Sequence, residues 1–295
     1  MLISIEQITE RIFLVKGENR GKFPFSHSVL IDDDVCVLID TGCGRAQLER
    51  IQSRSLNMVL NSHSHIDHTS GNWLFPHVPV VVPKEEYDYN GNLQALSQRY
   101  VSRELSEMWR TFVTKVSIFQ DAPPSRWYRG GDLFDCGHTR WEAIHTPGHS
   151  SGHHCFFERE KKILFSSDID LTRFGPWYGN EESSIDEFLE SIERVRKLSP
   201  EIILSSHRGV VREDIDNKLV AFAQVIEQRE ENIYAFLTKE RTIKEIVDRA
   251  FIYGKFPYVP SLLRYWERIM VLKHLHRLMG KGDVVKTGKG YKQTG

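Results

Sequence analysis

Residue types that bind metals are concentrated in one short segment behind an apolar run. Positions 58–60 are Met-Val-Leu, and positions 63–68 then hold His63, His65, Asp67 and His68. Neutral imidazole and carboxylate are preferred ligands of zinc, and they also suit iron and manganese. In an extended segment His63 and His65 would face one side, because side chains repeat every two residues. The segment therefore predicts a metal site at the end of a buried strand rather than a solvated histidine cluster.

Three further segments carry metal-capable residues directly behind apolar strands, and they contribute His149, Asp168 and His207. A fourth apolar run, residues 37–39, leads straight into Asp40. Loops at strand ends present functional groups on a rigid frame. We therefore expect these loops to converge on the same site as segment 63–68.

The order of these motifs, from Asp40 to His207, resembles that of the metallo-β-lactamase superfamily. The resemblance implies an α/β fold, the αββα sandwich, in which two mixed sheets lie face to face with helices outside and a dinuclear site at one rim. By motif matching, the first metal would be held by His63, His65 and His149, the second by Asp67, His68 and His207, and Asp168 would bridge them. Asp67 and Asp168 would be the catalytic carboxylates, with Asp67 taking up a proton. Asp40 is expected behind the ligands, where a carboxylate orients an imidazole.

A pair of cations makes a metal-dependent hydrolase the expected function. A water shared by two cations loses a proton readily, since one zinc ion alone brings the pKa of water from about 15.7 to about 7. The expected substrate is a small molecule with an ester, thioester, lactone or phosphodiester bond. Two zinc ions are the expected cofactors, and iron or manganese would also be accepted, because every ligand offers nitrogen or oxygen.

Details of the motifs narrow the branch of the superfamily. Penicillin-hydrolysing members commonly carry cysteine where this chain has Asp168, and di-iron oxygen reductases usually carry glutamate where it has His65. Glyoxalase II-like enzymes, lactonases, persulfide dioxygenases and small lactamase-like ribonucleases remain. Two alternatives to the dinuclear hydrolase therefore stay open. One is a persulfide dioxygenase with a single iron on His63, His149 and Asp168, and the other is an RNA-binding or RNA-processing hydrolase.

The chain is expected to divide near residue 212. Residues 1–212 alternate short apolar runs with helical patterns and would form the catalytic domain, with a helical insertion at 84–119. Residues 213–295 favour helices at 217–238, 242–250 and 261–279 and then a hairpin, so this module resembles a winged helix. Six basic residues near its end would let it touch nucleic acid: Lys273, Arg277, Lys281, Lys286, Lys289 and Lys292. A packing module with a solvated basic face is the simpler interpretation.

The loop after Asp168 is rich in aromatic residues and glycine and is the expected substrate wall. Arg173 would fix an anion there, Tyr178 would donate to a developing oxyanion, and Trp177 would pack in the wall. His153, which follows the ligand motif at His149, is expected to line the cleft. The insertion at 84–119 would lie near the same rim, as a lid or as the face of a homodimer.

Overall composition argues against a membrane partner. The net charge is −1, and no stretch approaches the roughly eighteen apolar residues of a membrane-spanning helix. The four cysteines lack paired spacing, and the first ten residues include acids where a secretory signal would be basic and then apolar. We therefore expect a cytoplasmic protein.

Overall fold

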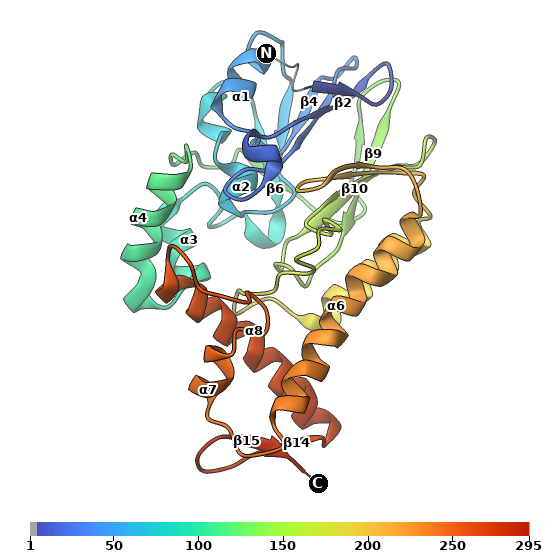
Figure 1. Cartoon of the computed structure of the whole chain (residues 1–295). Coiled ribbons are helices and arrows are strands. Elements are labelled where there is room, and N and C mark those ends of the chain that lie inside the picture. The colour runs from blue at the N-terminus through green and yellow to red at the C-terminus, as the bar shows by residue number, and fades with distance from the viewer. Residues whose placement is uncertain (1–4, 295) are drawn as a thin grey trace.

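The computed structural model describes residues 5–294 (Figure 1), and its first layer is a mixed sheet of seven strands. In spatial and chain order these are β1 (Ile5–Gln7), β2 (Ile12–Val15), β3 (Ser28–Ile31), β4 (Val37–Ile39), β5 (Met58–Leu60), β6 (Val80–Pro83) and β7 (Arg126–Tyr128). Pairs from β1 to β4 are antiparallel and pairs from β4 to β7 are parallel. The intervening short helices are η1 (Glu18–Gly21), α1 (Arg45–Ile51), α2 (Ile66–Thr69) and η2 (Asn72–Leu74). Helix α1 supplies the crossover that the parallel pair β4 and β5 needs.

The second layer is a six-stranded sheet that also follows chain order. Its strands are β8 (Leu133–Asp135), β9 (Arg140–His145), β10 (His154–Glu158), β11 (Ile163–Ser167), β12 (Ile202–Ser205) and β13 (Gly209–Val211). All neighbours are antiparallel except β11 and β12, which are parallel and connected through α5 (Ile185–Lys197). These two strands therefore end at the same edge of the sheet.

Apolar side chains of both sheets form the central core. Along β11, Phe165 faces the opposite sheet and Leu164 faces outward, because successive side chains alternate between the faces of a strand. Phe165 shares the central cluster with Trp141, Phe156 and Ile39. Helix α1 covers the outer face of the first sheet, and α5 covers that of the second. This arrangement confirms the predicted αββα sandwich.

Segment 84–119 is mainly helical. It contains η3 (Lys84–Glu86), α3 (Leu93–Tyr100), η4 (Arg103–Leu105) and α4 (Ser106–Val116). The Asn92 side chain begins α3 by accepting a hydrogen bond from the backbone N–H of Ala95. Apolar residues of α3 and α4 share one buried cluster with Ile66 of α2 and Leu262 near the C-terminus. The segment thus bridges the sandwich and the last helices, while its role as a lid or dimer face stays a prediction.

Helices dominate after residue 212. The elements there are α6 (Ile215–Phe236), α7 (Ile243–Asp248), α8 (Pro260–Lys281), β14 (Val284–Lys286) and β15 (Tyr291–Gln293). Figure 1 shows α8 running from beside α3 and α4 towards the hairpin of β14 and β15. Helices α6 and α8 contribute to the same hydrophobic cluster as α5, so the division into two domains at residue 212 stays a prediction. Among the helices of residues 5–294, none combines the length and the apolar character that a membrane-spanning segment requires.

Three of the six basic residues near the C-terminus bind acceptors within the chain. The Lys273 ammonium donates to the Ser183 carbonyl at 2.6 Å, and the Arg277 guanidinium donates to Glu230 at 2.8 Å. Lys281 also forms an ion pair with Glu230. These contacts give no support to nucleic-acid binding, which stays a prediction.

We predict that Trp141→Ala lowers the free energy of unfolding by about 3–5 kcal/mol, because it opens a cavity between the sheets. Trp141 is fully buried, whereas Trp127 of the first sheet is 44% exposed and Trp127→Ala serves as the control. Denaturant titration followed by circular dichroism measures both variants. Equal, small losses would contradict the assignment of Trp141 to the central core.

Candidate metal centre

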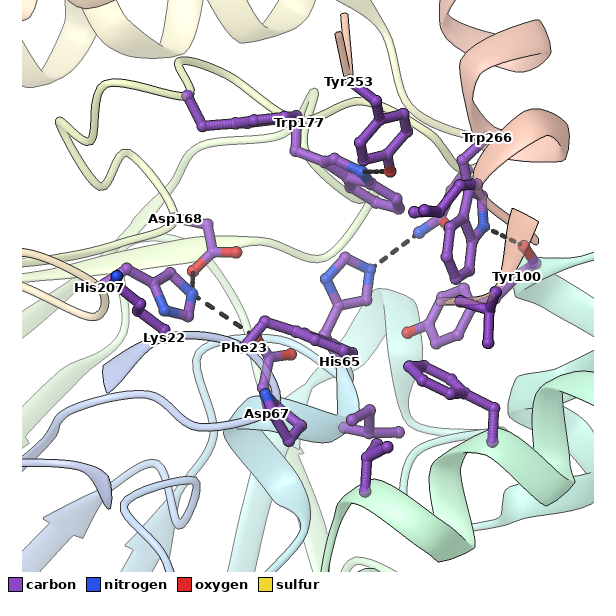
Figure 2. Close-up of a pocket in the computed structure, with 18 of the residues that line it drawn as sticks. Lys22, Phe23, His65, Asp67, Tyr100, Asp168, Trp177, His207, Tyr253 and Trp266 are labelled. Carbon is purple, nitrogen blue, oxygen red and sulfur yellow. Dashed lines mark hydrogen bonds and ion pairs between the residues drawn. The ribbon is translucent and has the colours of Figure 1, made fainter. Parts of the chain in front are cut away.

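Loops from both sheets converge at one rim of the sandwich (Figure 2). They contribute His63, His65, Asp67 and His68 after β5, His149 after β9, Asp168 after β11 and His207 after β12. Because β11 and β12 are parallel, Asp168 and His207 emerge at the same edge of the second sheet. The structure therefore brings all seven predicted side chains together.

The seven side chains form two adjoining groups, within each of which the potential ligand atoms lie within 4.8 Å of one another. The first group is His63, His65, His149 and Asp168, and the second is Asp67, His68 and His207. Asp168 contacts both groups. One of its carboxylate oxygens lies 3.1 Å from Nε2 of His149, and the other lies 2.9 Å from Nε2 of His68.

Hydrogen bonds behind the site fix the orientation of three imidazoles. Each ring donates through its Nδ1 atom. His68 donates to the Asp40 carboxylate at 2.7 Å, His149 donates to the Trp177 carbonyl at 2.9 Å, and His207 donates to the Gly21 carbonyl at 2.6 Å. The opposite nitrogen, Nε2, faces Asp168 in all three rings. A ring held through Nδ1 offers the Nε2 lone pair to a cation, which is how proteins orient metal-binding histidines.

Nε2 of His63 is a buried polar atom of the site that lacks a hydrogen-bond partner among the described residues. The side chain is fully buried, this nitrogen has no hydrogen-bond partner between residues 5 and 294, and the nearest Asp168 oxygen lies 4.0 Å away. An unsatisfied buried polar atom costs about 1–3 kcal/mol. A divalent cation would satisfy it, and the nitrogen and oxygen donors around it fit zinc, iron or manganese.

Burial and neighbouring charges set the protonation states. Burial lowers the pKa of His63 and His65 well below the ordinary value, so both rings stay neutral. Burial opposes ionisation of Asp168, but nearby imidazoles outweigh it and hold its pKa well below the usual range. Burial also opposes protonation of His207, yet the Asp168 carboxylate raises that pKa to about 9. A cation binding beside His207 would therefore displace a proton, so affinity would rise with pH.

Asp40 lies directly behind the ligands. Its buried carboxylate accepts hydrogen bonds from Nδ1 of His68 and from the hydroxyl and backbone N–H of Ser62, each at 2.7 Å. The Asp40 backbone has a φ of 59°, in the left-handed region that aspartate and asparagine tolerate better than most residues. Asp40 thus orients His68 and the turn that leads to His63.

Of the three residues that the sequence placed in the substrate wall after Asp168, one lines the cavity. Within the described chain, Trp177 lines the cavity beside the metal centre, whereas Arg173 is exposed and lines no part of it. Tyr178 is fully buried, with its hydroxyl 2.8 Å from Nε2 of His274 and 3.1 Å from Nη1 of Arg229. Tyr178 therefore points into the protein interior, away from the cavity that Trp177 lines. The predicted roles of Arg173 and Tyr178 are therefore corrected.

His153 also differs from its predicted place in the cleft. It is fully buried, and its Nε2 accepts a hydrogen bond from the backbone N–H of Asp168 at 3.0 Å. Its Nδ1 donates to the Thr146 carbonyl at 3.0 Å. His153 therefore holds the backbone of Asp168 and does not line the cavity.

An apolar cavity of about 800 Å³ adjoins the metal centre. Figure 2 shows Tyr100, Trp177 and Trp266 near His65, while Asp168 and His207 lie on the other side of the cavity. Aromatic and aliphatic walls come from the Trp177 loop, from α4 and from the C-terminal region: Trp109, Phe112, Val113, Val116, Phe174, Tyr253, Val259 and Leu263. The volume and lining are typical of a site for an apolar small-molecule group.

Sequence reasoning missed a buried carboxylate that joins two of the metal loops. Glu86, at the end of η3, accepts hydrogen bonds from the Ser150 hydroxyl at 2.6 Å, from the Gly152 backbone N–H at 3.0 Å and from the Ser64 backbone N–H. Burial raises the pKa of Glu86 to about 7. In the sequence Glu86 follows two other charged residues, so the segment has the composition of a solvent-exposed loop. Its place just behind an apolar strand is the signal that could have found it.

Comparison with known proteins agrees with this geometry. The sequence model of the metallo-beta-lactamase superfamily matches residues 21–207. An atrochrysone carboxyl ACP thioesterase of Aspergillus fumigatus is 24% identical over 278 residues, covering 87% of this chain and 78% of that protein. Human acyl-coenzyme A thioesterase MBLAC2 is 30% identical over 152 residues, covering 45% of this chain and 53% of that protein.

Solved structures share the fold over nearly the whole chain. A metallo-beta-lactamase family protein from Thermus thermophilus has a TM-score of 0.75 at 21% identity, covering 97% of this chain and 100% of its own. A beta-lactamase domain protein from Burkholderia ambifaria has a TM-score of 0.78 at 19% identity, covering 98% and 94%. The C-terminal helices therefore belong to the shared architecture.

We predict that Asp40→Asn weakens the binding of a divalent cation by about 10–100-fold. Asparagine tolerates the left-handed backbone, but its amide replaces one oxygen with a donor that cannot accept from His68 or Ser62. Zinc titration of the demetallated chain against a competing chelator measures the effect, with Asp88→Asn at an exposed position as the control. Unchanged affinity in Asp40→Asn would contradict the orienting role.

Proposed function

Because the chain belongs to the metallo-beta-lactamase superfamily, we propose that it is a metal-dependent hydrolase that cleaves thioesters of large apolar acyl groups. The observation that carries this proposal is the position of seven metal-capable side chains beside an apolar cavity of about 800 Å³. Two relatives named as thioesterases support the choice of bond. A phosphodiester fits less well, since its charge would lose solvation against aromatic walls.

In this proposal His63, His65 and His149 would hold one divalent cation and Asp67, His68 and His207 a second, and Asp168, whose carboxylate adjoins both groups, would contribute to holding them. Zinc is the expected ion, and iron or manganese would suit the same donors. The cations would supply the Lewis acidity that makes water nucleophilic at neutral pH and polarises a thioester carbonyl.

The chain's own groups orient the substrate and move the proton. The Asp67 carboxyl is buried, burial raises its pKa, and its Oδ2 lies 3.5 Å from Nε2 of His207. A carboxylate beside the attacking water can act as a general base. We assign to the Asp67 oxygen that would not hold the cation the proton released by the attacking water, which would then pass to the departing thiolate. Trp177 and Trp266 would surround the acyl chain and exclude water.

The two alternatives receive less support. A persulfide dioxygenase with one iron would use His63, His149 and Asp168 alone, and it would leave the adjoining group around His68 and His207 without a role. An RNA-processing enzyme would need free basic groups, and three of the six predicted ones, Lys273, Arg277 and Lys281, are engaged within the chain. The second group of ligands therefore favours a dinuclear hydrolase over the dioxygenase, and the apolar cavity favours a thioester over a charged strand.

We predict that removing the cations with a chelator abolishes thioester hydrolysis and that added zinc restores it, because the cations would activate the attacking water. His63→Ala and Asp168→Ala should lose nearly all turnover while remaining folded. Release of free thiol from long-chain acyl-coenzyme A measures the rate, and metal analysis should find two ions per chain. A demetallated chain as active as the native one would refute the mechanism.

We predict that Val116→Trp lowers activity towards long acyl thioesters and spares short ones, because Val116 lines the apolar cavity and a larger side chain would fill it. The control is Thr114→Trp, which adds the same bulk at an exposed position of α4. The ratio of kcat/KM for long and short acyl chains is the measurement. An equal ratio in both variants would place the acyl group elsewhere.

A further inference from the structure

The buried Glu86 carboxylate lies between the two loops that carry the histidines of the first group. One oxygen accepts from the Ser150 hydroxyl and the Gly152 backbone N–H, and the other accepts from the Ser64 backbone N–H. Ser64 lies between the two histidines of one loop, and Ser150 directly follows the histidine of the other. A single side chain thus connects the backbones on both sides of the first group.

Only a carboxylate can accept hydrogen bonds from both loops at this position. Glu86 is fully buried, and the three groups that donate to it are all uncharged. Burying a carboxylate among neutral partners is costly, but an apolar side chain would leave all three donors without an acceptor, and an amide would accept on one side only. The approach is also close, since a Cβ on Gly152 would lie 2.5 Å from Cγ of Glu86.

We propose that Glu86 is a positioning residue that sets the spacing between His65 and His149 and thereby the affinity of the first cation site. The two rings meet there, with Nδ1 of His65 2.8 Å from Nε2 of His149. A loop that shifts by a fraction of an ångström would move one ligand away from the other. The inference rests on the proposed metal centre and extends it to a residue outside the ligand set.

The second group takes its orientation from other partners. His68 donates to Asp40, and His207 donates to the Gly21 carbonyl. Loss of the Glu86 contacts should therefore weaken one cation site and leave the other nearly unchanged. A general loss of stability would not produce this selectivity.

The test variant is Glu86→Gln, which keeps the shape of the side chain and one of its oxygens. The amide nitrogen of glutamine is a donor and cannot accept a hydrogen bond. Whether this nitrogen faces the N–H of Ser64 or the donors of Ser150 and Gly152, one of the two loops loses its acceptor. Glu85→Gln is the matched control, because it makes the same change at the exposed neighbouring position.

The experiment is a zinc titration of each demetallated full-length chain against a competing chelator, together with its thermal unfolding without metal. In Glu86→Gln we expect the affinity for one of the two ions to fall about 10–100-fold, with the other ion and Glu85→Gln nearly unaffected. The absorption spectrum of the cobalt-loaded chain should change in the same variant, because ligand geometry at one site has shifted.

A lowered unfolding temperature with both zinc affinities unchanged would mean a purely structural role and would overturn the proposal. Should Glu86→Gln fail to fold, Ser150→Ala removes one donor only, and we expect a smaller loss at one ion; unchanged affinity there would equally overturn it. Failure of the native chain to hydrolyse thioesters would refute the proposed substrate without altering these affinities, so the two outcomes are distinguishable.

Discussion

Face-to-face packing of the two sheets is the interaction on which the metal centre depends. The loops that carry the metal-capable side chains follow strands of both sheets, so neither layer holds a complete set. Trp141, Phe156 and Phe165 of the second sheet share one buried cluster with residues of the first, which fixes how the layers lie on each other. Asp168 then contacts both groups from one sheet edge. An apolar contact between layers thus determines the geometry of a polar site at their rim.

Much of this arrangement follows from patterns that the sequence states locally. Buried strands such as β5 and β12 contain continuous apolar runs, and metal-binding residue types follow closely behind them, which predicted a metal site at strand ends. The sandwich and the grouping of the seven side chains were predicted from the resemblance that the order of these motifs carries. The strands β1, β7, β8 and β13 were not predicted, because each is short, includes a polar residue or glycine, and is defined by its partner more than by its own composition. The loop sequence also does not show which of Trp177 and Tyr178 faces the interior of the protein. Tyr178 is identified as the interior residue by its contacts with Arg229 and His274, which lie much later in the chain.

The C-terminal helices and the insertion at 84–119 together shape the cavity. Nε1 of Trp266 on α8 donates to the carbonyl of Tyr100 at the end of α3 at 3.1 Å, and Nε1 of Trp177 lies 2.8 Å from the Tyr253 hydroxyl. Both tryptophans line the cavity. The sandwich therefore supplies the metal-capable groups, and the insertion and the C-terminal helices supply much of the cavity wall beside them.

Trp177 serves the centre in two separate ways. Its indole forms part of the cavity wall, while its backbone carbonyl accepts the Nδ1 proton of His149. A carbonyl is present whatever side chain the residue carries, so the hydrogen bond that orients His149 does not depend on the indole. A substitution at this position would therefore reshape the cavity wall and leave that hydrogen bond in place.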